Sequence, residues 1–423
     1  MDGGYELRRR AVELDAEGWR PGAIAAELGR SREWVRKWVH RYRTEGDSGL
    51  LERSRRPRSM PSRLEEHVRG QVISVREALS KDRHANVGPK AIHDEIERLG
   101  WIGRVPSLAS IKRILSEEDL TRPYRKRRRL TGATLGLPKL FLPGIWQQAD
   151  WVQDRHLEGG IRFSSLQIGD VGSHAMSSDQ HLRRTVYAAA GQVTEQAWPT
   201  LSIPYAMGTD NAFSKTTHRD NPWTLWVKTL LMFGVEAIIS PPNTLGFTNH
   251  VEACNWLWQD RTIDRWRYQS LGELRSDTVR FLDWANQRRS ILDPDLCGTR
   301  YPAQHVKNHV DTLRWPPAGF TIDNYLDTSH TNQIPITRGR VTFLRHVTEH
   351  HTITIAHTHW PVPDTLPIGI LTVAAINTTT AQLEIRHQGD LITTHPYPME
   401  PARVDPIHPT PDHGLLDHLP TMS

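Results

Sequence analysis

The chain has 423 residues, of which 37% are hydrophobic and 24% are charged, and its formal net charge is +5. This length exceeds one ordinary domain, and the positive charge favours a polyanionic partner. With two cysteines and no apolar run of about 18 residues, the sequence argues against a disulfide framework, a thiolate zinc site and a membrane span, and it predicts a cytosolic protein.

Residues 1–45 are predicted to form a helix-turn-helix DNA-binding domain. An amphipathic helix ends at Gly18, a short helix follows Pro21, and Gly29 leads into a third helix that Ser31 can cap. The last helix of such a domain enters the major groove of DNA. The alternative is a plain three-helix bundle with a solvated basic face. The residues expected to face DNA are Arg30, Arg32, Arg36 and Lys37.

Two basic linkers flank a second helical domain. Residues 46–65 form the first linker, in which prolines interrupt a basic run, and residues 121–137 form the second. Residues 66–120 show helical spacing of apolar residues and are predicted to form a second, winged-helix-like helix-turn-helix domain, with Lys112 and Arg113 facing DNA. Basic linkers can contact phosphates or can simply be solvated. The candidate phosphate contacts in the linkers are Arg53, Arg55, Arg56, Arg125, Lys126, Arg127, Arg128 and Arg129.

Three acidic residues within 138–305 stand at the predicted ends of secondary-structure elements. Asp150 ends the segment Trp-Gln-Gln-Ala-Asp after an apolar run, and Asp210 follows a second predicted strand in the segment Gly-Thr-Asp-Asn-Ala-Phe. Glu252 lies near the start of a long helical pattern. Two carboxylates at strand ends and one on a helix can converge, and converging carboxylates repel each other unless a cation lies between them. An all-oxygen site favours Mg²⁺ or Mn²⁺.

These segments resemble the catalytic core of integrase-like insertion-sequence transposases, which carry an Asp-Asp-Glu triad on a ribonuclease H-like fold. The predicted order over 138–305 is three strands, helix, strand, helix, strand and helix, as in that mixed α/β core. Ala212 stands where the family usually has glycine, and Asn249 lies three residues before the glutamate, where four is commoner. The resemblance implies that the catalytic and metal-binding residues are Asp150, Asp210 and Glu252.

The resemblance also implies two bound ions, Mg²⁺ or Mn²⁺, which support DNA cleavage at element ends and strand transfer into target DNA. The expected partner is double-stranded DNA, bound by a homo-oligomer of a cytoplasmic, nucleoid-associated bacterial protein. Near the triad, Asn211 is expected to orient Asp210 or a water, Asn249 is expected to support the site, and Asp170 is interpreted as structural or supporting. Two alternatives stay open: a catalytically inactive DNA-binding regulator derived from a transposase, and a ribonuclease H-like nuclease.

The remaining chain is predicted to form a separate small domain. Residues 306–330 have the proline and glycine content of a linker, and 331–397 contain about five short strands typical of a small β-barrel, which we expect to be removable without unfolding the core. Residues 398–423 are rich in proline and histidine and are predicted to be disordered. The expected fold class is multidomain α+β, with helix-turn-helix units, a ribonuclease H-like mixed α/β core and a small C-terminal β-barrel.

Overall fold

A computed structural model describes most of the chain. The described residues are 3–53, 65–100, 105–121, 140–214, 223–241, 246–291, 297–326, 334–411 and 413–417. The chain divides into two compact units, Met1–Glu66 and His67–Ser423. Among the helices in these described ranges, none is both long enough and apolar enough to cross a membrane.

The first unit is a small helical bundle with apolar side chains from three helices in its core. Ser31 caps the third helix by accepting a hydrogen bond from the Trp34 N–H at 3.1 Å. Arg8 donates to the Leu50 carbonyl at 2.9 Å, and its guanidinium lies 4.3 Å from the centre of the Trp38 ring. These contacts stabilise the packing of the three helices, which follow one another in the order that the sequence predicts for a helix-turn-helix. The elements are α1 (Gly3–Ala16), α2 (Pro21–Glu27), α3 (Arg32–Glu45) and the 3₁₀ helix η1 (Gly46–Leu50).

The second helical domain is docked on the core within the second unit. Asp277 is fully buried on α11, where it accepts a hydrogen bond from Tyr268 Oη at 2.6 Å and lies 3.3 Å from His84 Nε2. Arg261 of the core donates to the Ala85 carbonyl at 3.1 Å. Buried polar contacts of this kind hold the domain on the core. The elements of the domain are α4 (Glu66–Lys81), α5 (Pro89–Arg98) and α6 (Leu108–Glu117), and α11 (Leu271–Gln287) belongs to the core.

The core is a mixed sheet covered by helices. In it, β1 is antiparallel to β2 and β2 to β3, whereas β1, β4 and β5 are mutually parallel neighbours. The chain order of three strands, helix, strand, helix, strand and helix confirms the predicted ribonuclease H-like mixed α/β core. Its elements are β1 (Trp146–His156), β2 (Arg162–Asp170), β3 (Met176–His181), α7 (Val186–Gln192), the π-helical turn η2 (Val193–Ala197), α8 (Trp198–Leu201), β4 (Ala206–Thr209), α9 (Leu225–Met232), β5 (Glu236–Ile239) and α10 (Asn249–Arg261).

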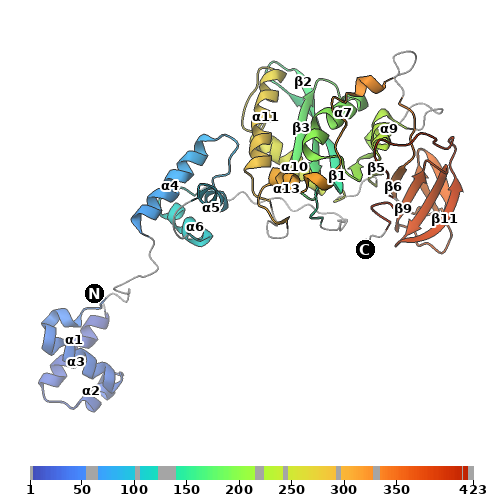
Figure 1. Ribbon diagram of the computed structural model, residues 1–423. Helices are drawn as coiled ribbons and strands as arrows, with labels where there is room; N and C mark the ends of the chain where they lie inside the picture. Colours follow the sequence, from blue (N-terminus) through green and yellow to red (C-terminus); the bar gives the residue numbers. More distant parts are fainter. Residues whose placement is uncertain are drawn as a thin grey trace. The chain divides into compact units, whose positions relative to one another are not determined.

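The C-terminal strands continue the same sheet (Figure 1), so the predicted closed β-barrel is wrong for the described strands. The sheet order is β11-β10-β9-β6-β5-β4-β1-β2-β3, because β6 pairs in parallel with β5. Trp223 of the core stacks on Phe343 and Tyr397 with ring centroids 6.3 and 5.9 Å apart, so one apolar core spans both parts. The strands are β6 (Arg340–His346), β9 (Leu371–Asn377), β10 (Gln382–His387) and β11 (Asp390–Pro396), and β7 (Thr352–Ile355) and β8 (Thr358–Pro361) form a separate hairpin.

The predicted linker before these strands and the predicted disordered tail after them also contact the core where they are described. In the linker, Arg314 donates to the Gly234 carbonyl at 3.2 Å. In the tail, the Ile407 N–H donates to the Met232 carbonyl at 2.7 Å, and Leu416 is buried in an apolar cluster on the sheet. Single apolar residues in this proline-rich tail are therefore buried against the core, and their burial gives the tail a defined structure. The linker elements are α13 (Pro302–Asn308), η4 (Val310–Thr312) and η5 (Ile322–Tyr325).

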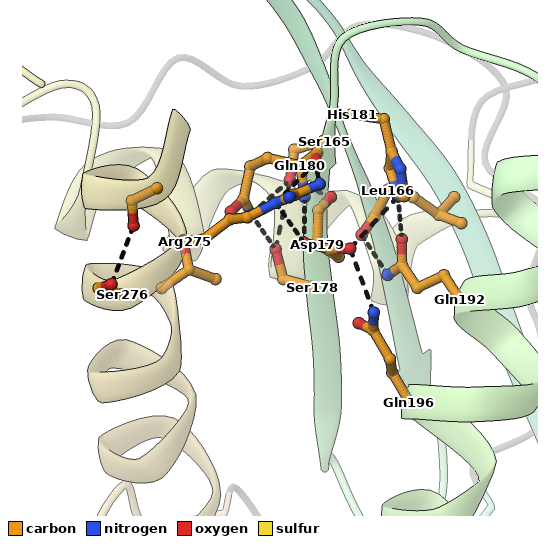
Figure 2. A network of polar contacts seen from close by, with 12 residues as sticks. Ser165, Leu166, Ser178, Asp179, Gln180, His181, Gln192, Gln196, Arg275 and Ser276 are labelled. Atoms are coloured by element: carbon orange, nitrogen blue, oxygen red, sulfur yellow. Dashed lines mark hydrogen bonds and ion pairs between the residues drawn. The ribbon is translucent and has the colours of Figure 1, made fainter. Parts of the chain in front are cut away.

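Side chains close the opposite edge of the sheet, strand β3 (Figure 2). Arg275 of α11 donates to the Gln180 carbonyl at 3.1 Å, while Gln196 of η2 donates to Asp179 Oδ2 at 3.2 Å from the other side. The Asn286 amide bonds both backbone groups of the first residue of β3. An edge strand with its backbone groups capped offers less to another chain.

Candidate active site

Asp150 and Asp210 lie on neighbouring parallel strands at the carboxyl edge of the sheet. Strand β1 pairs with β4 so that Gln148 is opposite Gly208, and each aspartate is two residues further along its chain. Neighbouring strands are about 4.8 Å apart, so the backbone atoms of the two aspartates lie close together and their carboxylates can approach each other. A side chain at Gly208 would place its Cβ 2.9 Å from Trp146 Nε1, so the absence of a side chain there permits the packing of β1 against β4.

Helix α10 brings Glu252 to the same edge. Buried Gln148 fixes the start of the helix, because its Nε2 donates to the Phe247 carbonyl at 2.7 Å and its Oε1 accepts from the N–H of the residue before Glu252 at 3.2 Å. Asn255, on the same helix, donates its Nδ2 to Asp150 Oδ2 at 2.7 Å. Residues three apart share a helix face, so Glu252 and Asn255 both lie toward β1.

The charges of the triad interact in the folded protein. Burial raises the pKa of Asp150 from 3.8 to about 6, and the negative charges of Asp210 and Glu252 also raise it, whereas the Asn255 hydrogen bond lowers it. A carboxylate whose ionisation is opposed by two neighbouring carboxylates is stabilised by a cation. The donors that converge here are all oxygens, so the residues fit a hard divalent cation such as Mg²⁺ or Mn²⁺.

Each of the other two carboxylates also accepts a local hydrogen bond. Thr248 Oγ1 donates to Glu252 Oε1 at 2.7 Å, and the Ala212 N–H donates to Asp210 Oδ1 at 2.9 Å. Each of these bonds engages one carboxylate oxygen, so the second oxygen of each acid can still bind an ion. In the described ranges, the group whose possible ligand atoms all lie within 4.8 Å of one another is instead His93, Asp94 and Glu97.

Aromatic packing holds the segment that follows Asp210. Phe213 is buried, and its ring stacks on that of Trp151, the residue after Asp150, with centroids 6.5 Å apart. The 3₁₀ helix η3 (Asn211–Phe213) begins directly after Asp210. Ala212 lies in this turn without a positive φ, so the backbone does not require the glycine that is usual in the family.

Asn211, Asn249 and Asp170 occupy three different environments. Asn211 lies beside Asp210 and bonds two later elements, as described below. Asn249 is exposed at the first residue of α10. Asp170 is fully buried opposite Gln147, three residues or about 10 Å along β1 from Asp150. It accepts hydrogen bonds from backbone N–H groups and a serine hydroxyl, and these bonds stabilise a turn away from the triad.

The predicted DNA-facing residues are exposed wherever they are described. Arg36 makes no hydrogen bond or ion pair with any other described residue. Arg53 forms an ion pair with Glu45, so part of its charge is used inside the first unit. The exposed set is Arg30, Arg32, Arg36, Lys37, Arg53, Lys112 and Arg113. Outside the described residues lie Arg55, Arg56, Arg125, Lys126, Arg127, Arg128 and Arg129.

Three residues near the triad were missed by the sequence analysis. Gln148 had a signal, since it is one of two glutamines in an otherwise apolar strand segment. Asn255 also had one, its helical spacing from Glu252. Arg345 bonds Asn211 across 134 residues of sequence, and no local pattern indicates that contact.

Asp150 gives the metal-free protein a pH-dependent stability. Its pKa is higher in the folded chain than the ordinary value of 3.8, so its contribution to stability is full below about pH 4 and is lost as the pH rises through about 6. In metal-free buffer, the free energy of unfolding of the wild type should fall by about 2–3 kcal/mol relative to that of Asp150→Asn between about pH 4 and 7. Urea denaturation with a chelator measures this difference. Parallel pH profiles for the two proteins would contradict the assignment.

Comparison with known proteins gives two homeodomain-like matches and several distant structural ones. Residues 5–51 and residues 34–115 each match a model described as a homeodomain-like domain. No curated protein matches the chain. A chain of the simian T-cell lymphotropic virus intasome in complex with PP2A regulatory subunit B56 gamma is 14% identical, with a TM-score of 0.34, over 68% of this chain and 88% of that chain.

Two forms of the HTLV-2 integrase catalytic core domain in complex with magnesium are also similar. Each is 16% identical to this chain. The dimeric form has a TM-score of 0.28 over 36% of this chain and 91% of that chain, and the trimeric form has 0.29 over 39% and 97%. With homeodomain-like helices ahead of a sheet in the ribonuclease H-like order, the chain is similar to the integrase-like transposases.

Proposed function

We propose that the chain is a DNA transposase that cleaves DNA at the ends of a mobile element and joins those ends to target DNA. The observation that carries this proposal is geometric and concerns three acids at one edge of the sheet. The register of β1 and β4 sets Asp150 beside Asp210, and Asn255, one helical turn from Glu252, donates to the Asp150 carboxylate at 2.7 Å. The homeodomain-like helices supply the binding of double-stranded DNA. The chain thus combines a carboxylate site with helices suited to DNA binding, the two parts that the proposed reaction uses.

In this proposal, Asp150, Asp210 and Glu252 hold two ions, Mg²⁺ or Mn²⁺. When bound, the ions supply an activated oxygen nucleophile and stabilise the leaving oxygen of the phosphodiester. Asn255 orients the Asp150 carboxylate through its 2.7 Å hydrogen bond, and Gln148 fixes the helix that carries Glu252. The first nucleophile is water, which frees a 3′-hydroxyl, and that hydroxyl then attacks target DNA.

The docked second helical domain gives the proposal a means of positioning DNA. Buried Asp277 and its contact with His84 fix α4 and α5 to the core, while Lys112 and Arg113 of α6 stay exposed. A duplex bound by α6 is therefore held in one place relative to the triad. We expect the transposase to act as a homo-oligomer on DNA, since two element ends must be joined to one target.

A cleavage and joining assay tests the proposed function. The purified chain is mixed with labelled DNA that carries the inverted repeats flanking its gene, with a plasmid target, and with Mg²⁺, Mn²⁺ or a chelator. We expect nicks with free 3′-hydroxyls at the repeat ends and joined products, each dependent on the metal ion. Cleavage without joining at any repeat would support the nuclease instead, and specific binding without cleavage would support the inactive regulator.

Loss of Arg36 should weaken sequence-specific DNA binding. Arg36 is exposed on α3, and an arginine that reads a base contributes roughly 1–3 kcal/mol. We expect Arg36→Ala to weaken binding to the element end by roughly 5- to 150-fold and to weaken binding to random DNA less, as measured by fluorescence anisotropy. Arg9→Ala is the matched control. Arg9 is also an exposed arginine, but it lies on α1, and its Nε is paired with Glu13 Oε1 at 3.4 Å. Equal losses on both DNAs would mean that Arg36 contacts phosphate.

A further inference from the structure

The carboxyl edge of the sheet carries a buried arginine as well as the acids. Strands β1, β4, β5 and β6 are parallel to their neighbours in that order, so their carboxyl ends meet at one edge. Arg345 is the next-to-last residue of β6. Asp150 lies two residues past the part of β1 that pairs with β4, and Asp210 directly follows β4. Active sites of sheets with parallel strands lie at this edge. A strand of the C-terminal extension therefore reaches the candidate active site.

The Arg345 guanidinium connects the ends of two strands. Its Nη2 donates to Asn211 Oδ1 at 2.6 Å, and its Nη1 donates to the Ser240 carbonyl at 3.0 Å. Asn211 Nδ2 donates to the same Ser240 carbonyl at 3.3 Å, which closes a triangle of hydrogen bonds. The Nε of the arginine donates to the Thr354 carbonyl at 3.0 Å. A planar fork with several fixed donors suits this bridging role, and lysine cannot reproduce it.

The charge of Arg345 has no carboxylate partner within ion-pair distance among the described residues. The residue is 7% exposed, and burial lowers the pKa of its guanidinium to about 10. A buried charge is costly unless it is paired or fully hydrogen-bonded, and here the acceptors are carbonyls and one amide. The amide belongs to Asn211, which directly follows Asp210. The arginine is thus bonded to the residue that directly follows a triad acid.

We propose that Arg345 is a positioning residue of the active site, which holds Asn211 and the end of β5 so that the Asp210 carboxylate is set for metal binding. This inference rests on the proposed function. It makes the C-terminal extension of the sheet part of the catalytic site, although the extension contributes no ligand. Residues that support metal ligands in this way usually change metal affinity or activity by about 10- to 100-fold when they are replaced.

Arg314 provides a matched control at the opposite end of the same two strands. It donates to the carbonyls of Gly234 and Pro204, each two residues before β5 or β4 begins. Burial lowers the pKa of its guanidinium to about 10, as for Arg345. Both arginines thus bond carbonyls at strand ends, with Arg345 buried and Arg314 half-buried, but Arg314 is remote from Asp210. A comparison of variants at the two positions therefore separates the general effect of losing such an arginine from the effect of losing a residue that positions Asp210.

The test compares Arg345→Lys, Arg345→Met and Arg314→Lys in the full chain. The first readout is the Mn²⁺ concentration that gives half-maximal cleavage of the element-end DNA. The second is the rise in melting temperature that Mn²⁺ produces without DNA, which reports metal binding independently of chemistry. We expect both Arg345 variants to need about 10- to 100-fold more Mn²⁺ by both readouts. Their KM for DNA should be unchanged. Arg345→Lys should remain impaired although lysine keeps the positive charge. Arg314→Lys is expected to lower the metal-free melting temperature but to leave the Mn²⁺ response at wild type.

A double-mutant cycle with Asn211→Ala tests whether Arg345 acts through that residue. If it does, the double variant needs no more Mn²⁺ than the worse single variant, because both substitutions break the same link. Additive effects, or a wild-type Mn²⁺ response in Arg345→Met, would overturn the inference. A chain in which Mn²⁺ binding depends on Arg345 but no DNA is cleaved would support the inference and overturn the proposed transposase. A wild-type chain with neither response would overturn both.

Discussion

Asp150→Asn, Asp210→Asn and Glu252→Gln are each expected to abolish DNA cleavage and strand joining while binding of element-end DNA stays near wild type. Each substitution is close to isosteric, so packing should change little. Each removes one negative charge from a site whose cations are held by few carboxylates. Because the bound ions supply the chemistry, the expected loss is more than about 100-fold, beyond the usual effect of a supporting residue. Cleavage and joining of labelled element ends, together with gel-shift binding, measure both properties.

Asp154→Asn is the matched control for the triad. Asp154 lies on the same strand as Asp150, but it is exposed and forms an ion pair with Arg162 at 2.5 Å, a contact of small energetic weight. We expect this variant to cleave and join at the wild-type rate. Asp170→Asn is a poorer control, because the buried carboxylate accepts several N–H and O–H groups that an amide cannot all satisfy. A Glu252→Gln protein that joins strands at the parent rate would show that the third acid is misassigned.

Deletion of the chain from residue 334 onward should unfold the core. The deletion unpairs β5 and removes β6, together with the ring of Phe343 that stacks on Trp223. It also strips more than ten buried apolar side chains from one continuous cluster. The remaining core side chains that they cover, Trp223 among them, become exposed at a cost of about 1.5–3 kcal/mol for each large one, compared with the roughly 5–15 kcal/mol by which a domain is stable. We expect no cooperative thermal transition for the core in the truncated protein, as measured by scanning calorimetry.

Deletion of residues 1–53 is the control for this truncation, because these residues lie in the separate first unit. The core should then melt at the temperature of the full chain. Cooperative melting of the chain that ends at residue 333, at the full-length temperature, would mean that the C-terminal strands are a dispensable module after all.

The order of the core elements could be predicted from the sequence because its signals are local. An apolar run that ends in Asp150, a strand-like segment before Asp210 and a helical pattern at Glu252 each span fewer than about 15 residues. Parallel strands put their carboxyl ends at one edge, which is why these local signals predict that the acids converge. The observed register of β1 and β4 places the two aspartates side by side.

The C-terminal extension could not be predicted in the same way, because its defining contact is not local. Short alternating strands are compatible with a closed barrel and with the extension of an existing sheet. The choice depends on whether β6 pairs with β5, about 100 residues earlier in the chain. The contact between Arg345 and Asn211 depends on that pairing, so it was hidden with it. The buried part of the proline-rich tail was missed for the same reason, since Leu416 is ordered by packing on distant strands.

The position of bound Mn²⁺ would show which carboxylates hold the metal ion. Crystals of the full chain with an element-end duplex, soaked in Mn²⁺, can be measured near the manganese absorption edge. We expect anomalous density between the carboxylates of Asp150, Asp210 and Glu252, and we expect that density to be lost in the Asp210→Asn protein. Density at His93, Asp94 and Glu97 with none at the triad would contradict it, because the metal would then lie on α5, away from the acids proposed to cleave DNA.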